Sequence, residues 1–106
     1  MSKSPLFSIV LPTHNRPGFL EEAIGSVLAQ TVDDFELIVI DDGSSQPATV
    51  PEDKRVRLIR LSANRGPAFA RNAGLAEAQG RFVTFLDDDD LYTTDRLETA
   101  LAGLKQ

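Results

Sequence analysis

The sequence predicts an α/β fold in which helices cover a mostly parallel sheet, and three observations support this prediction. Short apolar runs, typical of buried strands, alternate with longer segments whose apolar residues recur at helical spacing. The predicted order is strand, helix, strand, strand, helix, strand, helix. A cluster of polar residues directly follows each predicted strand, as expected where parallel strands end at a ligand-binding edge.

The first half of the chain contributes two buried strands and one helix. Residues 6–11 are almost wholly apolar and Pro12 ends the run, so we expect a strand covered on both faces. From Pro17, which suits the first turn of a helix, the apolar spacing becomes helical. The predicted buried face of this helix consists of Leu20, Ala23, Ile24, Val27 and Leu28. Residues 35–40 form the second predicted strand.

The second half continues the alternation. Residues 56–61 mix apolar and basic side chains, which predicts a strand with one face in water. Residues 66–79 are rich in alanine and predict a helix, with Gly80 as its C-terminal stop. Residues 81–86 predict another strand, and residues 94–104 a last helix that Asp95 would help to start. We expect residues 1–106 to be one domain, or part of one.

Composition limits the kinds of partner. The 106 residues carry a net charge of −5, which argues against nucleic acid or an anionic membrane surface as the main partner. The chain contains no cysteine, which excludes disulfides and thiolate chemistry and suits a reducing compartment. We see neither an apolar run long enough to span a membrane nor a signal-peptide pattern. The expected location is the cytoplasm, or the inner face of a membrane.

Four consecutive aspartates, residues 87–90, follow the last predicted strand. Carboxylate oxygens are the ligands that Mg²⁺ and Mn²⁺ prefer, and Asp87 and Asp89 would point the same way from an extended segment. An isolated acidic run is more often a solvated turn, but a place at the end of a buried strand favours a cation and diphosphate site. We assign Asp90 to the turn into the last helix.

The clusters after the first two strands each allow two interpretations. Arg16 precedes a helix N-terminus, where a phosphate can bind, whereas Asn15 is more typical of a helix cap. Asp41 and Asp42, followed by Gly43, form either a plain turn or a site for ribose hydroxyls or a base N–H.

The third cluster, residues 64–67 (NRGP), leads into the alanine-rich helix, where Arg65 would lie at the positive end. Arg71, inside that helix, either contacts a ligand or clamps an acidic loop at Asp41 or Asp87. No Walker pattern and no G-x-G-x-x-G follow the first strand, which disfavours a P-loop or dinucleotide site.

In order and spacing, these clusters resemble glycosyltransferase family 2. The resemblance lies in FSIVLPTHNRPGFLEEAIGSVLAQTVDDFELIVIDDGSS and NRGPAFARNAGLAEAQGRFVTFLDDDDLYTTDRLE, nearly the whole chain. It implies a GT-A type fold, a Rossmann-like α/β/α sandwich that stops after the metal motif. It also implies inverting transfer from a nucleoside-diphosphate sugar, UDP-linked, to a glycan or glycolipid acceptor in polysaccharide biosynthesis, with Mn²⁺ or Mg²⁺ as cofactor.

The resemblance also implies roles for individual residues. The donor-binding residues would be Pro12, Thr13, Asn15, Arg16, Asp41, Asp42, Arg65, Asp87 and Asp88. Within this set, Asp42 would contact the uracil-like edge of the base, and Arg65 would lie near the base or phosphates. The run at 87–89 matches a DXD-type motif, in which Asp89 would be the principal metal ligand, with Asp87 beside it and Asp88 nearer the ribose. His14 stands where the family commonly has tyrosine, and its imidazole can still stack on the base.

Other expectations concern activity and assembly. Because the family's catalytic base lies beyond its metal motif, we expect the base beyond Gln106 and expect the 106-residue chain alone to bind donor without transferring sugar. The alternatives are a nucleotidyltransferase-like enzyme, whose usual Gly-rich, Lys-containing loop is missing, and a non-catalytic nucleotide-binding module. Exposed sheet edges also predict self-association.

Overall fold

The computed structural model of the chain describes residues 4–104. Within that range the elements are, in order, β1 (Phe7–Thr13), α1 (Pro17–Leu28), β2 (Phe35–Asp41), β3 (Val56–Arg60), α2 (Pro67–Glu77), β4 (Phe82–Phe85) and α3 (Arg96–Leu104). The four strands form one sheet in the order β3-β2-β1-β4, and every neighbouring pair is parallel. The predicted α/β fold with a parallel sheet is confirmed.

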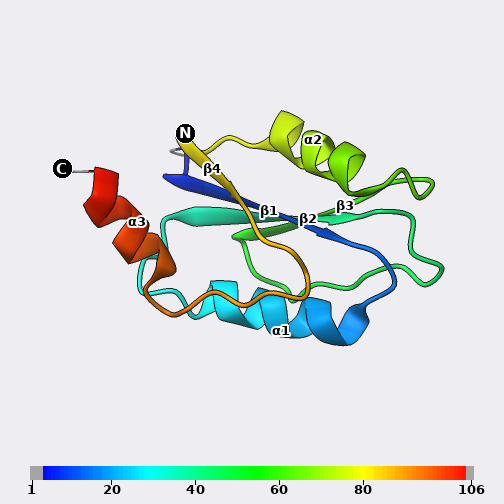
Figure 1. The fold of residues 1–106 in the computed structure, drawn as a ribbon, viewed down its shortest axis with the longest axis horizontal. Helices are drawn as coiled ribbons and strands as arrows, with labels where there is room; N and C mark the ends of the chain where they lie inside the picture. The colour runs from blue at the N-terminus through cyan, green and yellow to red at the C-terminus, as the bar shows by residue number, and fades with distance from the viewer. Residues whose placement is uncertain (1–3, 105–106) are drawn as a thin grey trace.

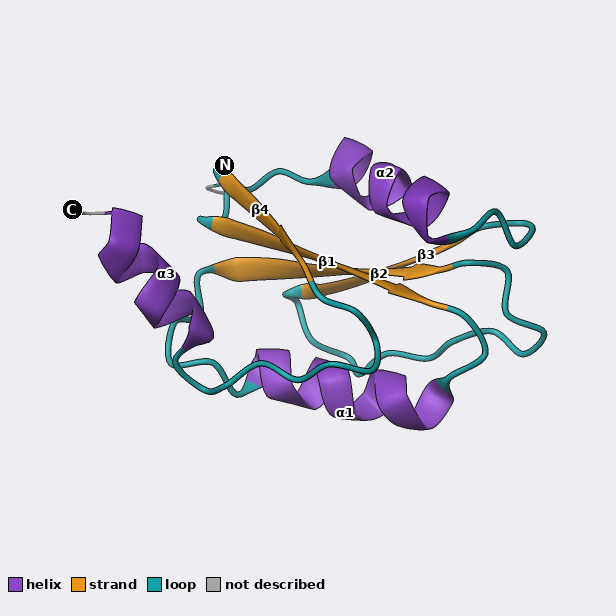
Figure 2. Cartoon of the chain, viewed as in Figure 1, coloured by secondary structure: helices purple, strands orange, loops and turns teal. Residues whose placement is uncertain are grey.

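Helices α1 and α2 cover opposite faces of the sheet (Figure 1; Figure 2). On the α1 face, Ile9 and Leu37 pack with Val27 of the helix, and Leu97 of α3 joins the same cluster. On the α2 face, Val10 and Ile38 pack with residues of α2 in a smaller cluster. Strands β1 and β2 are buried on both faces, which explains why their sequences are largely apolar.

Strand β3 contradicts the prediction of a single wet face. Arg57 pairs with Glu36 of β2, with Nη2 3.2 Å from Oε1, whereas Arg60 pairs with Asp41, with Nη1 2.9 Å from Oδ2. Side chains alternate along a strand, so residues three apart point to opposite faces. Each arginine therefore finds a carboxylate of β2 on its own side of the sheet.

The ends of the last two helices also differ from the expectation. Helix α2 ends at Glu77, because Ala78 already has extended backbone angles, so Gly80 is not its stop. Helix α3 begins at Arg96, and Asp95 precedes it with its backbone carbonyl accepting the Thr99 N–H at 2.8 Å. Among the described residues, no helix combines the length and the hydrophobicity needed to cross a membrane.

Candidate functional site

A pocket of about 430 Å³ opens at the carboxyl ends of the strands. Loops after all four strands contribute to it, as the parallel topology requires. Its lining consists of Pro12, Thr13, His14, Arg16, Asp42, Asn64, Pro67, Ala70, Arg71, Asp87, Asp88 and Asp89. Most of the site residues expected from the sequence therefore lie together, whereas Asn15, Asp41 and Arg65 do not line this pocket. A larger hollow of about 990 Å³ lies between α1 and residues 44–51, and none of the aspartates lines it.

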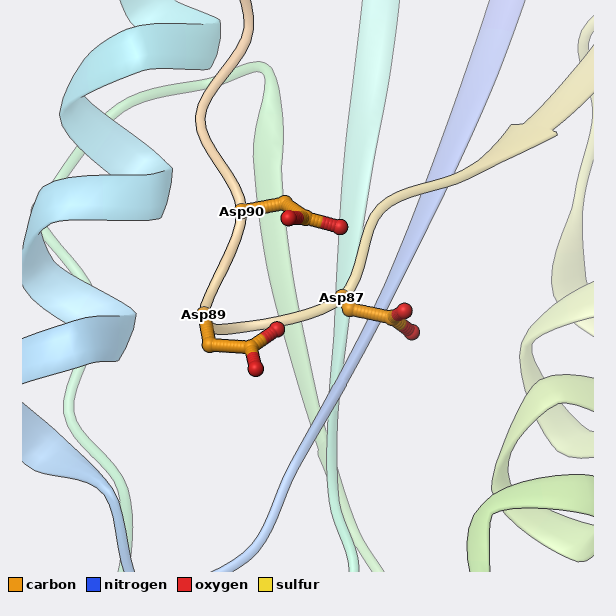
Figure 3. A group of neighbouring side chains, drawn as sticks. All are labelled: Asp87, Asp89 and Asp90. Carbon is orange, nitrogen blue, oxygen red and sulfur yellow. The ribbon is translucent and has the colours of Figure 1, made fainter.

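The aspartate run forms a tight turn instead of an extended segment. The Asp90 N–H donates to the carbonyl of Asp87 at 3.0 Å, which closes the turn. Asp87, Asp89 and Asp90 are exposed, and each offers a carboxylate oxygen within 4.8 Å of the others (Figure 3). The assignment of Asp90 to the turn into the last helix is therefore incomplete, because the turn brings its carboxylate to Asp87 and Asp89.

Asp88 points inward from the same turn and is only 9% exposed. The hydroxyl of Thr13 donates to its Oδ2 at 2.9 Å, and Nη1 of Arg16 lies 3.5 Å from its Oδ1. These contacts join the loop after β1 to the loop after β4. Asp88 therefore fixes the turn whose other carboxylates face outward.

Two arginines offset the charge of the exposed aspartates. Nη1 of Arg16 lies 3.6 Å from Oδ2 of Asp89, and Nη2 of Arg71 donates to Oδ1 of Asp87 at 3.2 Å. The sequence allowed Arg71 either to contact a ligand or to pair with Asp41 or Asp87, and in the structure it pairs with Asp87. Both arginines line the pocket, so this edge combines carboxylates and guanidiniums despite the negative net charge of the chain.

Asp42 binds the start of helix α2 from a distant loop. Its two carboxylate oxygens accept the backbone N–H groups of Arg65 at 2.8 Å and Gly66 at 2.9 Å. Gly66 is the N-cap position and has no side chain to cap the helix, so the carboxylate of Asp42, the first residue after β2, binds this end of the helix instead. The Arg65 side chain turns away, with its guanidinium 5.2 Å from the centre of the Phe69 ring.

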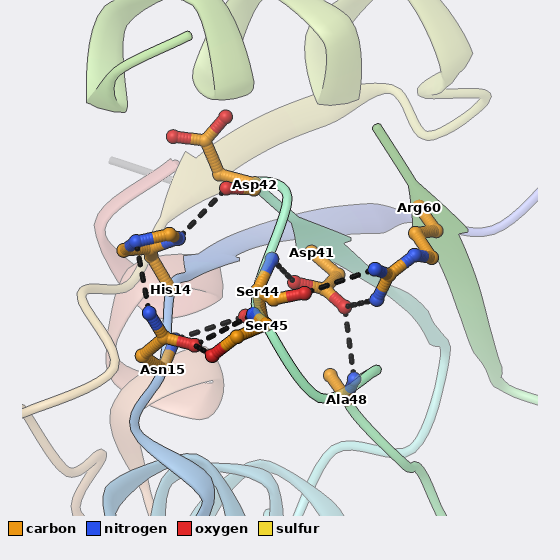
Figure 4. A network of polar contacts seen from close by, with 8 residues as sticks. All are labelled: His14, Asn15, Asp41, Asp42, Ser44, Ser45, Ala48 and Arg60. Carbon is orange, nitrogen blue, oxygen red and sulfur yellow. Dashed lines mark hydrogen bonds and ion pairs between the residues drawn. The ribbon is translucent and has the colours of Figure 1, made fainter. Parts of the chain in front are cut away.

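Asp41 is fully buried and holds the loop that follows β2 (Figure 4). Its oxygens accept the N–H groups of Ser44 at 3.0 Å and Ala48 at 2.8 Å and a donor of Arg60 at 2.9 Å. Burial acts to raise the pKa of Asp41, but the hydrogen bonds from Ala48 and Ser44 and the Arg60 charge outweigh it and lower that pKa. The sequence counted Asp41 among the ligand contacts, whereas its oxygens are bonded within the protein.

Gly43 lets the loops after β2 and β3 approach each other. Its φ is +67°, and a Cβ placed there would lie 2.5 Å from the carbonyl carbon of Ala63 and from the nitrogen of Asn64. Both atoms belong to the backbone, which cannot move aside as a flexible side chain would. Only glycine fits this position without a shift of the pocket wall.

Asn15 links the loops after β1 and β2 and does not cap helix α1. Arg16 occupies the N-cap position of that helix, and no side chain caps it. The Asn15 N–H donates to Oγ of Ser44, and its Oδ1 accepts both donors of Ser45. Asn15 has a positive φ of 54°, so its predicted cap role is replaced by a role in joining two loops.

His14 closes the same network on the pocket side (Figure 4). Its Nδ1 lies 2.8 Å from the carbonyl of Asp42, which can only accept, so Nδ1 carries the proton. Its Nε2 lies 3.0 Å from Nδ2 of Asn64. Asn64 belongs to the polar cluster expected after the third strand but was assigned no role, and the sequence did not point to Arg60. Arg60 could be found only from the pairing of the strands, because it lies opposite Asp41 only when β2 and β3 are paired in this register.

Comparison with known proteins decides the family. Residues 8–106 match the family model described as Glycosyl transferase family 2. The chain belongs to this family. The fold also matches the crystal structure of S. aureus TarS, with a TM-score of 0.80 and 28% identity over 93% of this chain and 19% of that one, so the predicted GT-A fold is confirmed.

Individual relatives agree with that assignment. An uncharacterized glycosyltransferase of Haemophilus influenzae is 45% identical over 96% of this chain and 43% of its own length. The UDP-Glc:alpha-D-GlcNAc-diphosphoundecaprenol beta-1,3-glucosyltransferase WfgD of Escherichia coli is 38% identical over 92% of this chain and 40% of its own length. S. aureus TarS 1-349, solved in complex with UDP-GlcNAc, has a TM-score of 0.81 and 29% identity over 93% of this chain and 31% of that one. The chain thus spans less than half the length of these relatives.

Proposed function

We propose that this chain binds the donor of a glycosyl transfer reaction, a nucleoside-diphosphate sugar, in the pocket at the carboxyl edge of the sheet. The observation that carries the proposal is the convergence of Arg16, Asp42 and the first three aspartates of the run, 87–89, on one pocket. TarS, solved with UDP and with UDP-GlcNAc, supports a UDP-linked donor, as does the UDP-Glc in the name of WfgD.

We propose Asp87 and Asp89 as ligands of a divalent cation, Mn²⁺ or Mg²⁺, with Asp90 as a third ligand. Three carboxylates whose oxygens lie within 4.8 Å of one another provide the hard oxygen donors that these ions prefer. A cation bound there would stabilise the negative charge of the departing nucleoside diphosphate. Asp88 lines the same pocket but is bonded to Thr13, so in this proposal it fixes the turn, and its contact with the ribose stays a prediction.

The other pocket residues bind and orient the donor in this proposal. Arg16 supplies positive charge for the diphosphate beside the start of helix α1. Asp42 keeps lone pairs free for a base N–H after accepting its two backbone bonds. His14, fixed by the Asp42 carbonyl, offers an imidazole face to the base. Arg65 has no part in this set, because it does not line the pocket and its guanidinium stacks on Phe69.

The proposed reaction is an inverting transfer to a glycan or glycolipid acceptor. The acceptor hydroxyl attacks the anomeric carbon, the nucleoside diphosphate leaves from the opposite side, and a general base takes the hydroxyl proton. We assign no base within the pocket, since its carboxylates are committed to the cation, to Thr13 or to helix α2. Donor binding without sugar transfer by the 106-residue chain stays a prediction.

Calorimetric titration of the 106-residue chain with UDP, in Mn²⁺ and in EDTA, tests the proposal. We expect Asp89→Asn to weaken UDP binding in Mn²⁺ by at least about tenfold and to abolish the effect of EDTA. The matched control is Asp33→Asn, an equal charge change at an exposed residue before β2, which should leave binding unchanged. The titration is repeated with GDP and with Mg²⁺. If neither nucleotide releases heat with either metal, the chain is not a donor-binding domain.

A further inference from the structure

Arg60 closes the outer side of the loop that follows β2. Its Nη1 donates to Oδ2 of Asp41 at 2.9 Å, and its Nη2 donates to the carbonyl of Ser44 at 2.9 Å. Asp41 has no exposed surface, so its charge depends on the donors around it. Without Arg60, a buried carboxylate loses its only cationic partner among the described residues, and the Ser44 carbonyl loses its side-chain donor.

The loop held by Arg60 in turn holds the loop after β1. Oγ of Ser44 accepts the Asn15 N–H at 2.9 Å, while the N–H and hydroxyl of Ser45 donate to Oδ1 of Asn15 at 2.9 and 3.0 Å. Asn15 has a φ of +54°, in the left-handed region, which asparagine adopts more readily than most L-residues. The bonds from Ser44 and Ser45 hold it in this conformation, which sets the direction of the chain on either side.

Asn15 stands between two residues that line the pocket, His14 and Arg16. We propose that Arg60 is a positioning residue of the donor site, which sets the places of His14 and Arg16 through the loop from Asp41 to Ser45. The inference rests on the proposed donor-binding function. Arg60 itself does not line the pocket, so it acts only through the contacts shown in Figure 4.

Strand β3 supplies a matched control in Arg57. Both arginines pair with a carboxylate of β2, and their side chains are similarly exposed, 39% for Arg57 and 42% for Arg60. Arg57 contacts Glu36 and the carbonyl of Glu77, at the end of helix α2 away from the pocket. Replacing Arg57 therefore removes a similar ion pair from the same strand and leaves the contacts of Asn15 in place.

The experiment measures UDP binding in Mn²⁺ by calorimetry, together with amide hydrogen exchange, for Arg60→Ala, Arg60→Lys and Arg57→Ala. We expect Arg60→Ala to weaken binding by about tenfold and Arg57→Ala by less than about twofold. Arg60→Lys keeps the charge beside Asp41 and should recover part of the loss, to within about threefold of wild type. Exchange at the amides of Asn15, Ser44 and Ala48 should accelerate in Arg60→Ala alone.

The outcomes separate this inference from the proposed function. If wild type binds UDP and Arg60→Ala binds as tightly as Arg57→Ala, the positioning role is wrong and the donor site stands. If wild type binds no UDP, the proposed function fails, and unchanged exchange at Asn15 in Arg60→Ala would then reject the loop-holding role too. Should Arg60→Ala not fold, Arg60→Gln takes its place, with an expected loss of about fivefold against the same control.

Discussion

Replacing Asp42 by asparagine tests how the site is anchored to helix α2. The carboxylate accepts two neighbouring backbone N–H groups, from Arg65 at 2.8 Å and Gly66 at 2.9 Å, and the residue is only 4% exposed. Asparagine has nearly the same shape but only one acceptor oxygen. Its amide group would therefore face one of the two N–H donors: the Arg65 N–H would lose its acceptor, whereas the Gly66 N–H would keep only Oδ1 of Asn64, 3.1 Å away.

The size of the effect follows from these two bonds. A hydrogen bond to a charged group contributes about 1.5–3 kcal/mol, and a negative charge at a helix N-terminus about 0.3–1 kcal/mol. We expect Asp42→Asn to lower the free energy of unfolding by about 2–4 kcal/mol. For a chain of this size, a loss in that range lowers Tm by about 10–20 °C.

Urea denaturation followed by circular dichroism, with the midpoint and slope fitted together, measures this loss. The control is Asp90→Asn, the same chemical change at an exposed carboxylate whose two close neighbours are also acidic. It should leave stability unchanged or slightly raised, because it relieves like-charge repulsion. The reasoning is refuted if Asp42→Asn loses less than about 0.5 kcal/mol, the range of ordinary surface substitutions.

Further predictions address the loop, the pH dependence and assembly. Gly43→Ala should lower Tm by several degrees, because the new Cβ would lie 2.5 Å from backbone atoms at a φ of +67°. Gly25→Ala, at a helix position with open space around it, should raise Tm. Thermal scans of both variants check this. Because the pKa of Asp41 in the folded protein lies below the ordinary aspartate value of 3.8, its stabilising effect is complete above that pH and is lost as the pH falls through the folded pKa. Asp41→Asn should therefore be less stable at pH 7 and lose less stability on acidification, which denaturation at a series of pH values measures. The edge strand β4 should promote concentration-dependent self-association in sedimentation, and a monodisperse monomer would contradict this.

The sequence was sufficient for the elements and for the edge at which the site lies. Strands β1 and β2 are buried on both faces, so their composition is largely apolar, and helix α1 has a regular apolar face. Parallel strands place their carboxyl ends together, so the polar clusters could be assigned to one edge of the sheet from the sequence. These features depend on local periodicity and chain order, both of which a single sequence contains.

The roles of individual polar side chains depended on which loops pack together in space. Asp41 and Asp42 are neighbours of the same residue type, yet one is bonded inside the loop after β2 and the other binds the start of helix α2. Asn15 is likewise a residue type that often caps helices, but here it contacts Ser44 and Ser45. Chain spacing does not contain these partners, because they lie on segments 23 to 30 residues away.

What the sequence alone determined is the family resemblance, the α/β fold and the set of residues at the carboxyl edge. The tertiary structure decided which carboxylates are exposed and which are bonded within the protein: the turn at 87–90 brings Asp90 to Asp87 and Asp89 and directs Asp88 toward Thr13. It also decided the place of Arg60, whose partner Asp41 lies opposite it only when β2 and β3 are in register. The physical reason is that a carboxylate's role depends on the donors within hydrogen-bond distance, and folding brings those donors from distant parts of the chain.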